Sequence, residues 1–283
     1  NKLRRFSPLH RFRKTKSFRL LVNSSINAPR FFKTGFYFPV ALRPVTHASL
    51  WLSPKTVEPN LTQLLRQICS KIHDSKKKRS LYDVGANVGW HSWNCKSVAP
   101  KMPLELFEPD KENVDLLNRT IEHSNLPKTR VHAVALSNRD GEVFFSADPL
   151  TSATGTIEPE DTTWSERYLK HPSPTIKVPC CRLDTLLDDL PPPGLIKIDV
   201  EGHEHAVLEG CELTLQRFRP ILIVESFPPR REIVFDFLKD LGYVVADAET
   251  LTDIADHTDN LIALRPDTPF PIPECIQHLT WRC

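Results

Sequence analysis

The 283-residue sequence has no run of about 18 apolar residues, the length that a membrane-spanning helix needs, and no stretch resembling the hydrophobic core of a signal peptide. Its seven cysteines form no C-x-x-C pair, and only Cys180 and Cys181 are adjacent. Neither a disulfide framework nor a zinc site is therefore expected, and reduced thiols are the default. With 40% apolar residues the chain can bury a large core, so we expect a soluble protein with one main domain.

The first 57 residues lack Asp and Glu but hold twelve Lys or Arg residues. The rest of the chain holds the other 25 basic residues and all 35 acidic ones, which gives it a net charge of −10. Basic arms of this kind act as targeting segments or contact nucleic acid, anionic lipid or an acidic domain. We expect a solvated or self-docked arm and a small irregular cap over residues 1–57. A cytoplasmic location is favoured, although the arm leaves organelle targeting open.

The sequence also lacks the fingerprint G-x-G-x-x-G, which argues against a nicotinamide dehydrogenase. In its place, residues 80–89 read SLYDVGANVG, with the pattern D-x-G-x-N-x-G. Leu81–Val84 suit a buried strand and the glycines suit a tight turn, after which a helix is expected through Ala99 with a stop at Pro100. Amides at such a turn can bind a carboxylate, and Asp83 can lie near a cationic group. The stretch predicts a nucleotide-type cofactor with an amino-acid moiety.

A second apolar strand pattern, Leu104–Phe107, is followed at once by Glu108. An acid at the end of the second strand, about twenty residues after the glycine turn, is placed to hold a ribose diol. Because parallel strands end at the same edge of a sheet, the turn and Glu108 together predict one cofactor site.

Beyond this point, strand and helix patterns alternate. Helical spacing begins at Glu58, after Asp110 and after Gly202, and extends from Arg231 to Leu241, whereas strand patterns lie at 130–136, 142–145, 195–200, 221–225, 243–245 and 261–264. The pair Asp140-Gly141 predicts a hairpin between the first two of these strands. Residues 148–174 are rich in Thr, Ser and Pro and are typical of a lid or substrate loop. The alternation predicts an α/β, doubly wound sheet.

The blocks DVGANVG, FEP, ALSN followed by DG, RLDTLL, IKIDVEGHE and PILIVES occur in this order. Together they resemble the FkbM-type methyltransferases, class I enzymes that use S-adenosylmethionine and mostly O-methylate secondary metabolites and sugars. The resemblance implies a Rossmann-like, mostly parallel sheet of about seven strands with helices on both faces over residues 58–266. Residues 1–57 would form the arm and cap, and residues 267–283 a C-terminal tail.

By motif, the resemblance also implies S-adenosyl-L-methionine as the cofactor and assigns residues to its parts. The methionine end would be lined by Asp83, Gly85, Asn87 and Gly89, the ribose held by Glu108, and the adenine placed near Ser137 and Asn138. Asp199, Glu201 and Glu204 match the family's D-x-E-G-x-E block, in which the position of His203 varies among relatives. Every one of these residues lies beyond residue 57, so residues 1–57 are expected to be dispensable for cofactor binding.

Methyl transfer from a sulfonium chiefly needs alignment, although a base near an alcohol acceptor would help by roughly a hundredfold. Asp199 is the first candidate for this base, with capping of the next helix or a bond to the cofactor's amino group as alternatives. His203 and Glu225 are the other candidate catalytic residues. Glu225 could face the acceptor or pair with Lys197 or an arginine. The acids and histidines between 201 and 205 point in divergent directions, so no metal site is expected.

The favoured acceptor is a hydroxyl of a small molecule or carbohydrate. A nucleic-acid methyltransferase that uses the basic arm is an alternative, but this chain has DVEG where enzymes that modify base amines usually carry Asn or Asp, two prolines and an aromatic residue. A nonenzymatic nucleotide-binding module is a more remote alternative, and detectable cofactor binding discriminates against it.

Overall fold

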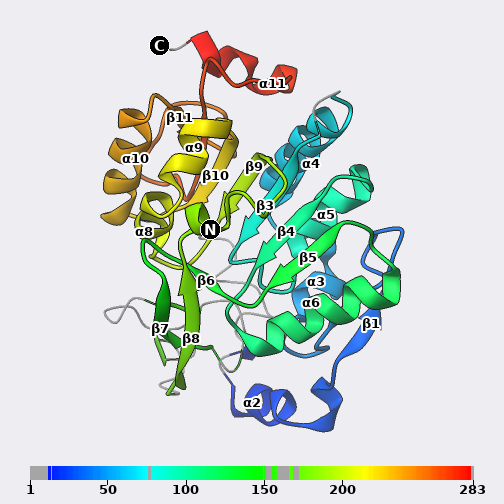
Figure 1. Ribbon diagram of the computed structural model, residues 1–283. Coiled ribbons are helices and arrows are strands. Elements are labelled where there is room, and N and C mark those ends of the chain that lie inside the picture. Colours follow the sequence, from blue (N-terminus) through cyan, green and yellow to red (C-terminus); the bar gives the residue numbers. More distant parts are fainter. Residues whose placement is uncertain are drawn as a thin grey trace.

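The computed structural model describes residues 12–13, 15–75, 78–148, 150, 155–157, 166–167 and 172–281. Its centre is a seven-stranded sheet with the order β11-β12-β10-β9-β3-β4-β5 (Figure 1). The strands are β3 (Ser80–Val84), β4 (Leu104–Phe107), β5 (Thr129–His132), β9 (Pro193–Ile198), β10 (Ile221–Glu225), β11 (Val244–Asp247) and β12 (Asn260–Leu264). The strands of this sheet run in one direction except β12, which is antiparallel to both of its neighbours, β10 and β11. The mostly parallel sheet predicted from the sequence is confirmed.

The strand order reverses direction between β3 and β9. From β3 the chain continues to β4 and β5 on one side, whereas β9 continues to β10 on the other side. In open α/β sheets, ligands bind outside the carboxyl ends of the strands at such a switch point. The topology therefore predicts a ligand site formed by the residues that follow β3 and β9.

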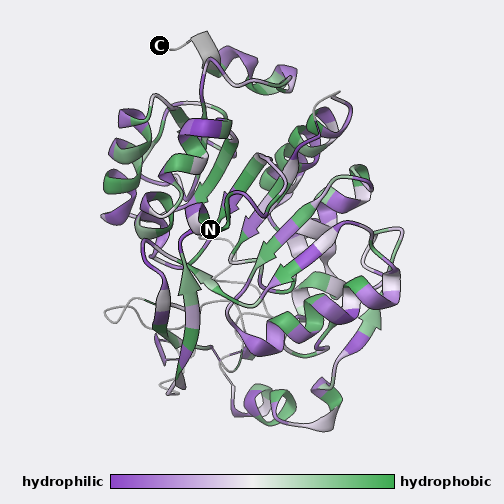
Figure 2. Cartoon of the chain, in the orientation of Figure 1, coloured by the Kyte–Doolittle hydropathy of each residue, from purple (hydrophilic) through white to green (hydrophobic). Residues whose placement is uncertain are grey.

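Helices cover both faces of the sheet (Figure 1). One face packs against α4 (Pro59–His73), α5 (Trp90–Val98) and α6 (Lys111–Ser124), and the other against α8 (Glu204–Glu209), α9 (Glu212–Phe218) and α10 (Arg230–Asp240). Successive strand residues serve the two cores in turn; on β3, Leu81 faces the first and Tyr82 the second. Figure 2 shows the central strands as mostly hydrophobic and the helices as mixed. In the described part of the chain, no helix is long and apolar enough to cross a membrane.

The residues before α4 form a small cap beside this domain. It contains α2 (Lys16–Val22), β1 (Arg30–Phe32), β2 (Val40–Leu42), α3 (Ala48–Leu52) and the 3-10 turns η2 (Ser25–Asn27) and η3 (Pro54–Thr56). β1 and β2 pair antiparallel, and the Ala41 N–H donates to Thr120 Oγ of α6 at 2.9 Å. Residues 1–11, which hold four of the twelve basic residues of the predicted arm, lie outside the described residues.

The segment 130–136 does not form the single strand that its pattern predicts. β5 ends at His132, whose ring stacks on Phe107 with centroids 4.7 Å apart and whose Nε2 lies 2.7 Å from the Glu105 carboxylate. These contacts hold His132 in the main sheet. The chain then turns, and β6 (Ala135–Leu136) joins a separate three-stranded sheet.

The hairpin predicted at Asp140-Gly141 is also wrong. β8 (Thr175–Cys181) lies between β6 and β7 (Gly141–Ser146) and pairs with both, parallel to β6 and antiparallel to β7. The local turn signal is outweighed here by pairing with a strand much farther along the chain. The remaining short elements are η4 (Leu183–Leu186), α11 (Glu274–Gln277) and η5 (His278–Trp281).

The close approach of the ends of β3 and β9 leads to a stability prediction. Gly85 follows β3 with a φ of +77°, and a Cβ there would overlap the backbone carbonyl oxygen of Asp199. Gly85→Ala should lower the free energy of unfolding by about 2–5 kcal/mol, through left-handed backbone strain and steric overlap together.

Gly35→Ala is the matched control for this variant. Gly35 also has a positive φ, +97°, but nothing lies within 4 Å of its ideal Cβ. This substitution should therefore cost only the backbone strain, about 1–2 kcal/mol. Urea denaturation followed by circular dichroism measures both variants, and equal losses would contradict the close approach.

Candidate active site

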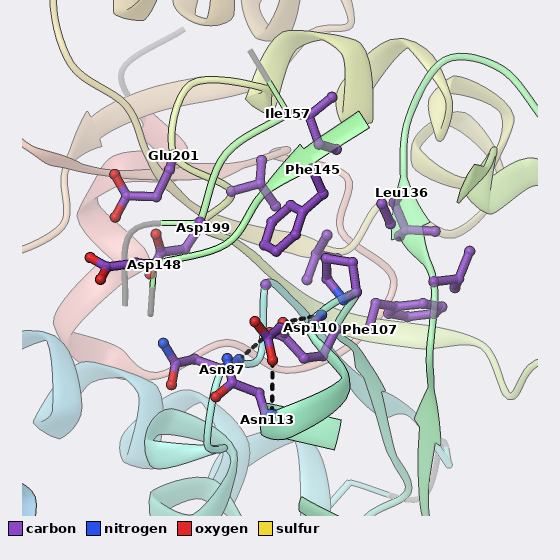
Figure 3. Close-up of a pocket in the computed structure, with 18 residues that line it drawn as sticks. Asn87, Phe107, Asp110, Asn113, Leu136, Phe145, Asp148, Ile157, Asp199 and Glu201 are labelled. Atoms are coloured by element: carbon purple, nitrogen blue, oxygen red, sulfur yellow. Dashed lines mark hydrogen bonds between the residues drawn. The ribbon is translucent and has the colours of Figure 1, made fainter. Parts of the chain in front are cut away.

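A cavity lies at the switch point, at the carboxyl ends of β3, β4 and β9 (Figure 3). Its polar wall comes from the glycine turn, the start of α6, the segment after β7 and the segment after β9, through Asn87, Glu108, Asp110, Asp148, Asp199 and Glu201. Figure 3 shows the apolar side chains Leu136, Phe145 and Ile157 on one side of the view and Asp148, Asp199 and Glu201 on the other. The cavity thus has an apolar region suited to a planar base and an acidic region suited to donor groups.

The glycine turn after β3 forms one wall. Gly85 lines the cavity, and Gly89, with a φ of +80°, is the N-cap of α5. Between them, Asn87 has a φ of +53°, and its Oδ1 accepts the Val88 N–H at 2.6 Å. The strand, turn and helix predicted from the sequence are confirmed, and α5 ends at Val98, beside the predicted stop.

Glu108 joins two walls of the cavity. One carboxylate oxygen accepts the Asn87 N–H at 2.7 Å and the other accepts the Asp110 N–H at 2.9 Å. Only 4% of the residue is exposed. Burial raises its pKa to about 7, although the two backbone N–H groups oppose this shift. Glu108 therefore fixes the glycine turn against the start of α6 and presents a titratable group to the cavity.

Asp83 belongs to β3, just before the glycine turn, and is not among the described residues that line the cavity. Its Oδ2 accepts a hydrogen bond from Ser92 Oγ of α5 at 2.7 Å. Its Oδ1 is buried and has no hydrogen-bond partner among the described residues. An unpaired buried carboxylate oxygen is costly, and a cationic or hydrogen-bond-donating ligand group would relieve that cost.

Lys197 and Asp199 form a partly buried ion pair at the end of β9. Lys197 Nζ lies 2.8 Å from Asp199 Oδ2, and the exposed fractions of the two side chains are 4% and 27%. Burial alone would raise the pKa of Asp199, but the Lys197 ammonium holds it below its ordinary value. Asp199 is therefore ionised at neutral pH and lines the cavity as a carboxylate.

Glu225, at the end of β10, completes this cluster. Burial and the neighbouring charge of Asp199 raise the pKa of Glu225 well above its ordinary value, and its side chain is hydrogen-bonded to Asp199. Glu225 is therefore the protonated partner that donates to the Asp199 carboxylate. The ion pair with Lys197 that the sequence suggested for Glu225 is made by Asp199 instead.

The other predicted residues lie beside the cavity. His203 is the N-cap of α8, and its Nε2 lies 3.0 Å from Ser137 Oγ. Asn138 donates to Glu209 Oε2 at 2.8 Å. Among the described residues that line the cavity, the neighbours Ala135 and Leu136 are present rather than Ser137 or Asn138. Their contact with adenine, and catalysis by His203, stay predictions.

Several residues of this region were missed from the sequence. Phe145 comes from β7, and Asp148 and Ile157 come from the connection after it, which its composition marks as a candidate substrate loop without distinguishing any single residue. Glu58, the N-cap of α4 with a φ of +41°, lies 2.9 Å from His91 Nε2, and its charge raises the pKa of Glu225 further. No local signal in the sequence places Glu58 near the ends of β9 and β10.

Comparison with known proteins finds similarity to methyltransferases. The family model described as the methyltransferase FkbM domain matches residues 83–245, more than half of the chain. A hexuronic acid methyltransferase of Haloferax volcanii is 30% identical over 156 residues, covering 54% of this chain and 58% of that protein. A protein of Beauveria bassiana named methyltransferase 1 is 26% identical over 144 residues, covering 47% and 58%. The matches thus span less than two thirds of either relative.

Among solved structures, a methyltransferase FkbM from Methylobacillus flagellatus has a TM-score of 0.46 and 14% identity, covering 88% of this chain and 58% of that one. The strand order of the central sheet, rather than this likeness, carries the assignment of the fold.

The cluster of Lys197, Asp199 and Glu225, called the acid cluster below, leads to a pair of stability predictions. Asp199→Asn leaves the buried Lys197 ammonium without its partner and should lower the free energy of unfolding by about 2–4 kcal/mol. Glu225→Gln replaces a protonated acid by an amide that can still donate to Asp199, so it should cost less than about 1 kcal/mol. Denaturant unfolding at pH 7 measures both. If the Glu225 variant loses as much stability as the Asp199 variant, the assignment of the proton to Glu225 is wrong.

Proposed function

The chain belongs to the FkbM methyltransferase family, and on this basis we propose that it transfers a methyl group from S-adenosylmethionine to a hydroxyl of a sugar or another small molecule. The family match includes the glycine turn, Glu108 and Asp199, which all lie at the switch point of the sheet. The observation that carries the proposal is the cavity that these residues share with an apolar region beside them.

The chain's own residues suit each part of this cofactor. The apolar side chains Leu136, Phe145 and Ile157 offer a surface for adenine, and Glu108 offers a carboxylate for the ribose hydroxyls. Asp83 does not line the cavity as described, but its Oδ1, which has no hydrogen-bond partner among the described residues, would suit a cationic group that approaches the glycine turn. When bound, the cofactor supplies an electrophilic methyl group on a sulfonium, so the protein has mainly to align an acceptor oxygen with it.

Asp199 is the residue best placed to act on the acceptor. Because Lys197 keeps it ionised, it can accept a hydrogen bond from the acceptor hydroxyl throughout the neutral pH range and orient the oxygen lone pair. Its lowered pKa makes it a weak base, so its role is to hold the hydroxyl and take the proton as the new C–O bond makes that proton acidic. Glu225 acts through Asp199, as a positioning residue.

The relatives and the charge of the cavity wall support the proposed acceptor class. The relative from Haloferax volcanii is named for a hexuronic acid, which supports a carbohydrate acceptor here. In this chain, however, Asp148, Asp199 and Glu201 line the acidic region. Like charges repel in a partly buried site, so an uncharged hydroxyl acceptor is favoured over an anionic one.

A transfer screen tests the function directly. The protein is incubated with methyl-labelled S-adenosylmethionine and with neutral sugars, hexuronates, small phenols, polyketides or RNA. We expect label on a neutral sugar or small-molecule hydroxyl, and less on the matching hexuronate. Label that appears on RNA alone would contradict the proposed acceptor class, and the absence of cofactor binding would contradict the activity.

The pKa of Glu108 generates a prediction for cofactor affinity. Ribose hydroxyls donate to a carboxylate, so binding favours the ionised form of Glu108, whose pKa is about 7 without ligand. Affinity for S-adenosylhomocysteine should therefore rise as the pH approaches 7 and level off above it. In Glu108→Gln, affinity should be lower by about 1–3 kcal/mol at pH 8 and lose this pH dependence.

Glu204→Gln provides the matched control for this titration. Burial raises the pKa of Glu204 to about 7 as well, but its carboxylate accepts the Gly202 N–H and does not line the cavity as described. This variant should keep the wild-type pH dependence of binding. Calorimetry from about pH 5.5 to pH 8 separates the two residues, and a flat profile in wild type would refute the role of Glu108.

A further inference from the structure

The connection between β7 and β8 supplies part of the cavity wall. Asp148, Gly155 and Ile157 line the cavity. Thr156, which lies between Gly155 and Ile157 in the chain, is held by three hydrogen bonds. Thr156 exchanges backbone hydrogen bonds with Ser146 at 2.8 and 3.1 Å, and its Oγ donates to the Glu201 carbonyl at 3.0 Å. This part of the connection is thus attached to β7 and to the segment after β9.

The N-terminal helix α2 packs against the same connection. Phe18 and Val22 of α2 form a buried cluster with Leu150, and these residues are 1%, 9% and 1% exposed. The helix is fixed at its start, where the Thr15 side chain accepts the Phe18 N–H at 3.2 Å. Leu20, on another face of α2, is 74% exposed. One face of α2 therefore packs against Leu150, and another face is exposed to solvent.

Leu150 is linked in turn to Asp148 on the cavity wall. The Leu150 N–H donates to Asp148 Oδ1 at 3.0 Å in a buried hydrogen bond, which fixes the orientation of that carboxylate. Asp148 is only 3% exposed, and Figure 3 shows its side chain on the same side of the view as those of Asn87 and Asp199. Packing in the cap is thus connected, through one backbone N–H, to an acid in the cavity.

We propose that Asp148 is a cofactor-binding residue of this cavity and that α2 is a positioning element that acts on it through Leu150. The inference rests on the proposed function, because the ligand is the S-adenosyl cofactor, whose ammonium and ribose hydroxyls are donors for a carboxylate. It runs against the expectation from the sequence that residues 1–57 are dispensable for cofactor binding. The reason is that Phe18 and Val22 of α2 pack on Leu150, which is hydrogen-bonded to Asp148 on the cavity wall.

The first experiment measures S-adenosylhomocysteine binding to the full chain by calorimetry, with thermal melting to confirm folding. Phe18→Ala removes the packing on Leu150 and should raise the Kd at least about fivefold, because the Asp148 carboxylate is no longer held in place. Leu20→Ala makes a similar truncation on the exposed face of the same helix and should leave the Kd within about twofold. Should Phe18→Ala fail to fold, Phe18→Leu makes the same comparison more mildly.

A double-mutant cycle then shows whether the effect passes through Asp148. Asp148→Ala should raise the Kd about tenfold, and adding Phe18→Ala to it should change the Kd by less than about twofold. A merely structural role for α2 would instead give effects that multiply. This inference would be overturned if the two substitutions raise the Kd by factors that multiply, or if a folded Phe18→Ala protein keeps the wild-type Kd. In either case, binding of the ligand by the wild type would still support the proposed function. If wild type does not bind the ligand, the proposed function fails and this inference with it.

Discussion

The contact on which the site depends is the close approach of the ends of β3 and β9. Gly85 can follow β3 there only because it lacks a Cβ, which would overlap the Asp199 carbonyl oxygen. The Asp199 N–H also donates to the Val84 carbonyl at 3.0 Å, so the two strands stay paired up to the point where both chains turn away. This brings the glycine turn and the acid cluster to one cavity, although about a hundred residues separate them in the chain.

The charges around Lys197 determine what this cavity can do. A buried ammonium needs a partner, and Asp199 provides it, while Glu225 keeps its proton and donates to Asp199. The cluster thus presents one fixed negative charge toward the cavity at neutral pH. Such an arrangement suits the orientation of a hydroxyl better than the removal of a proton from a resting substrate, and it agrees with a reaction in which the leaving group is already activated.

The parts of the fold and site that follow from local chemistry were predictable from the sequence. The strand, glycine turn and helix around Gly85, the acid after β4 and the acid after β9 each lie within a short, distinctive stretch. What could not be predicted depends on long-range pairing. β8 inserts between β6 and β7, and α2 packs on Leu150 although more than a hundred residues separate them. Neither the place of Asp148 on the cavity wall nor the packing of α2 therefore has a local signature. The predicted adenine contacts Ser137 and Asn138 immediately follow Leu136 on the cavity wall and stay predictions.

The central claim is that the cavity at the switch point holds an S-adenosyl cofactor between the glycine turn, Glu108 and Asp199. A crystal structure of the protein with S-adenosylhomocysteine tests it most directly. The account predicts the ribose hydroxyls within hydrogen-bonding distance of Glu108, the adenine against Leu136 and Phe145, and the sulfur directed toward Asp199. A ligand bound elsewhere on the sheet, or bound in this cavity with Glu108 turned away from the ribose, would contradict the account.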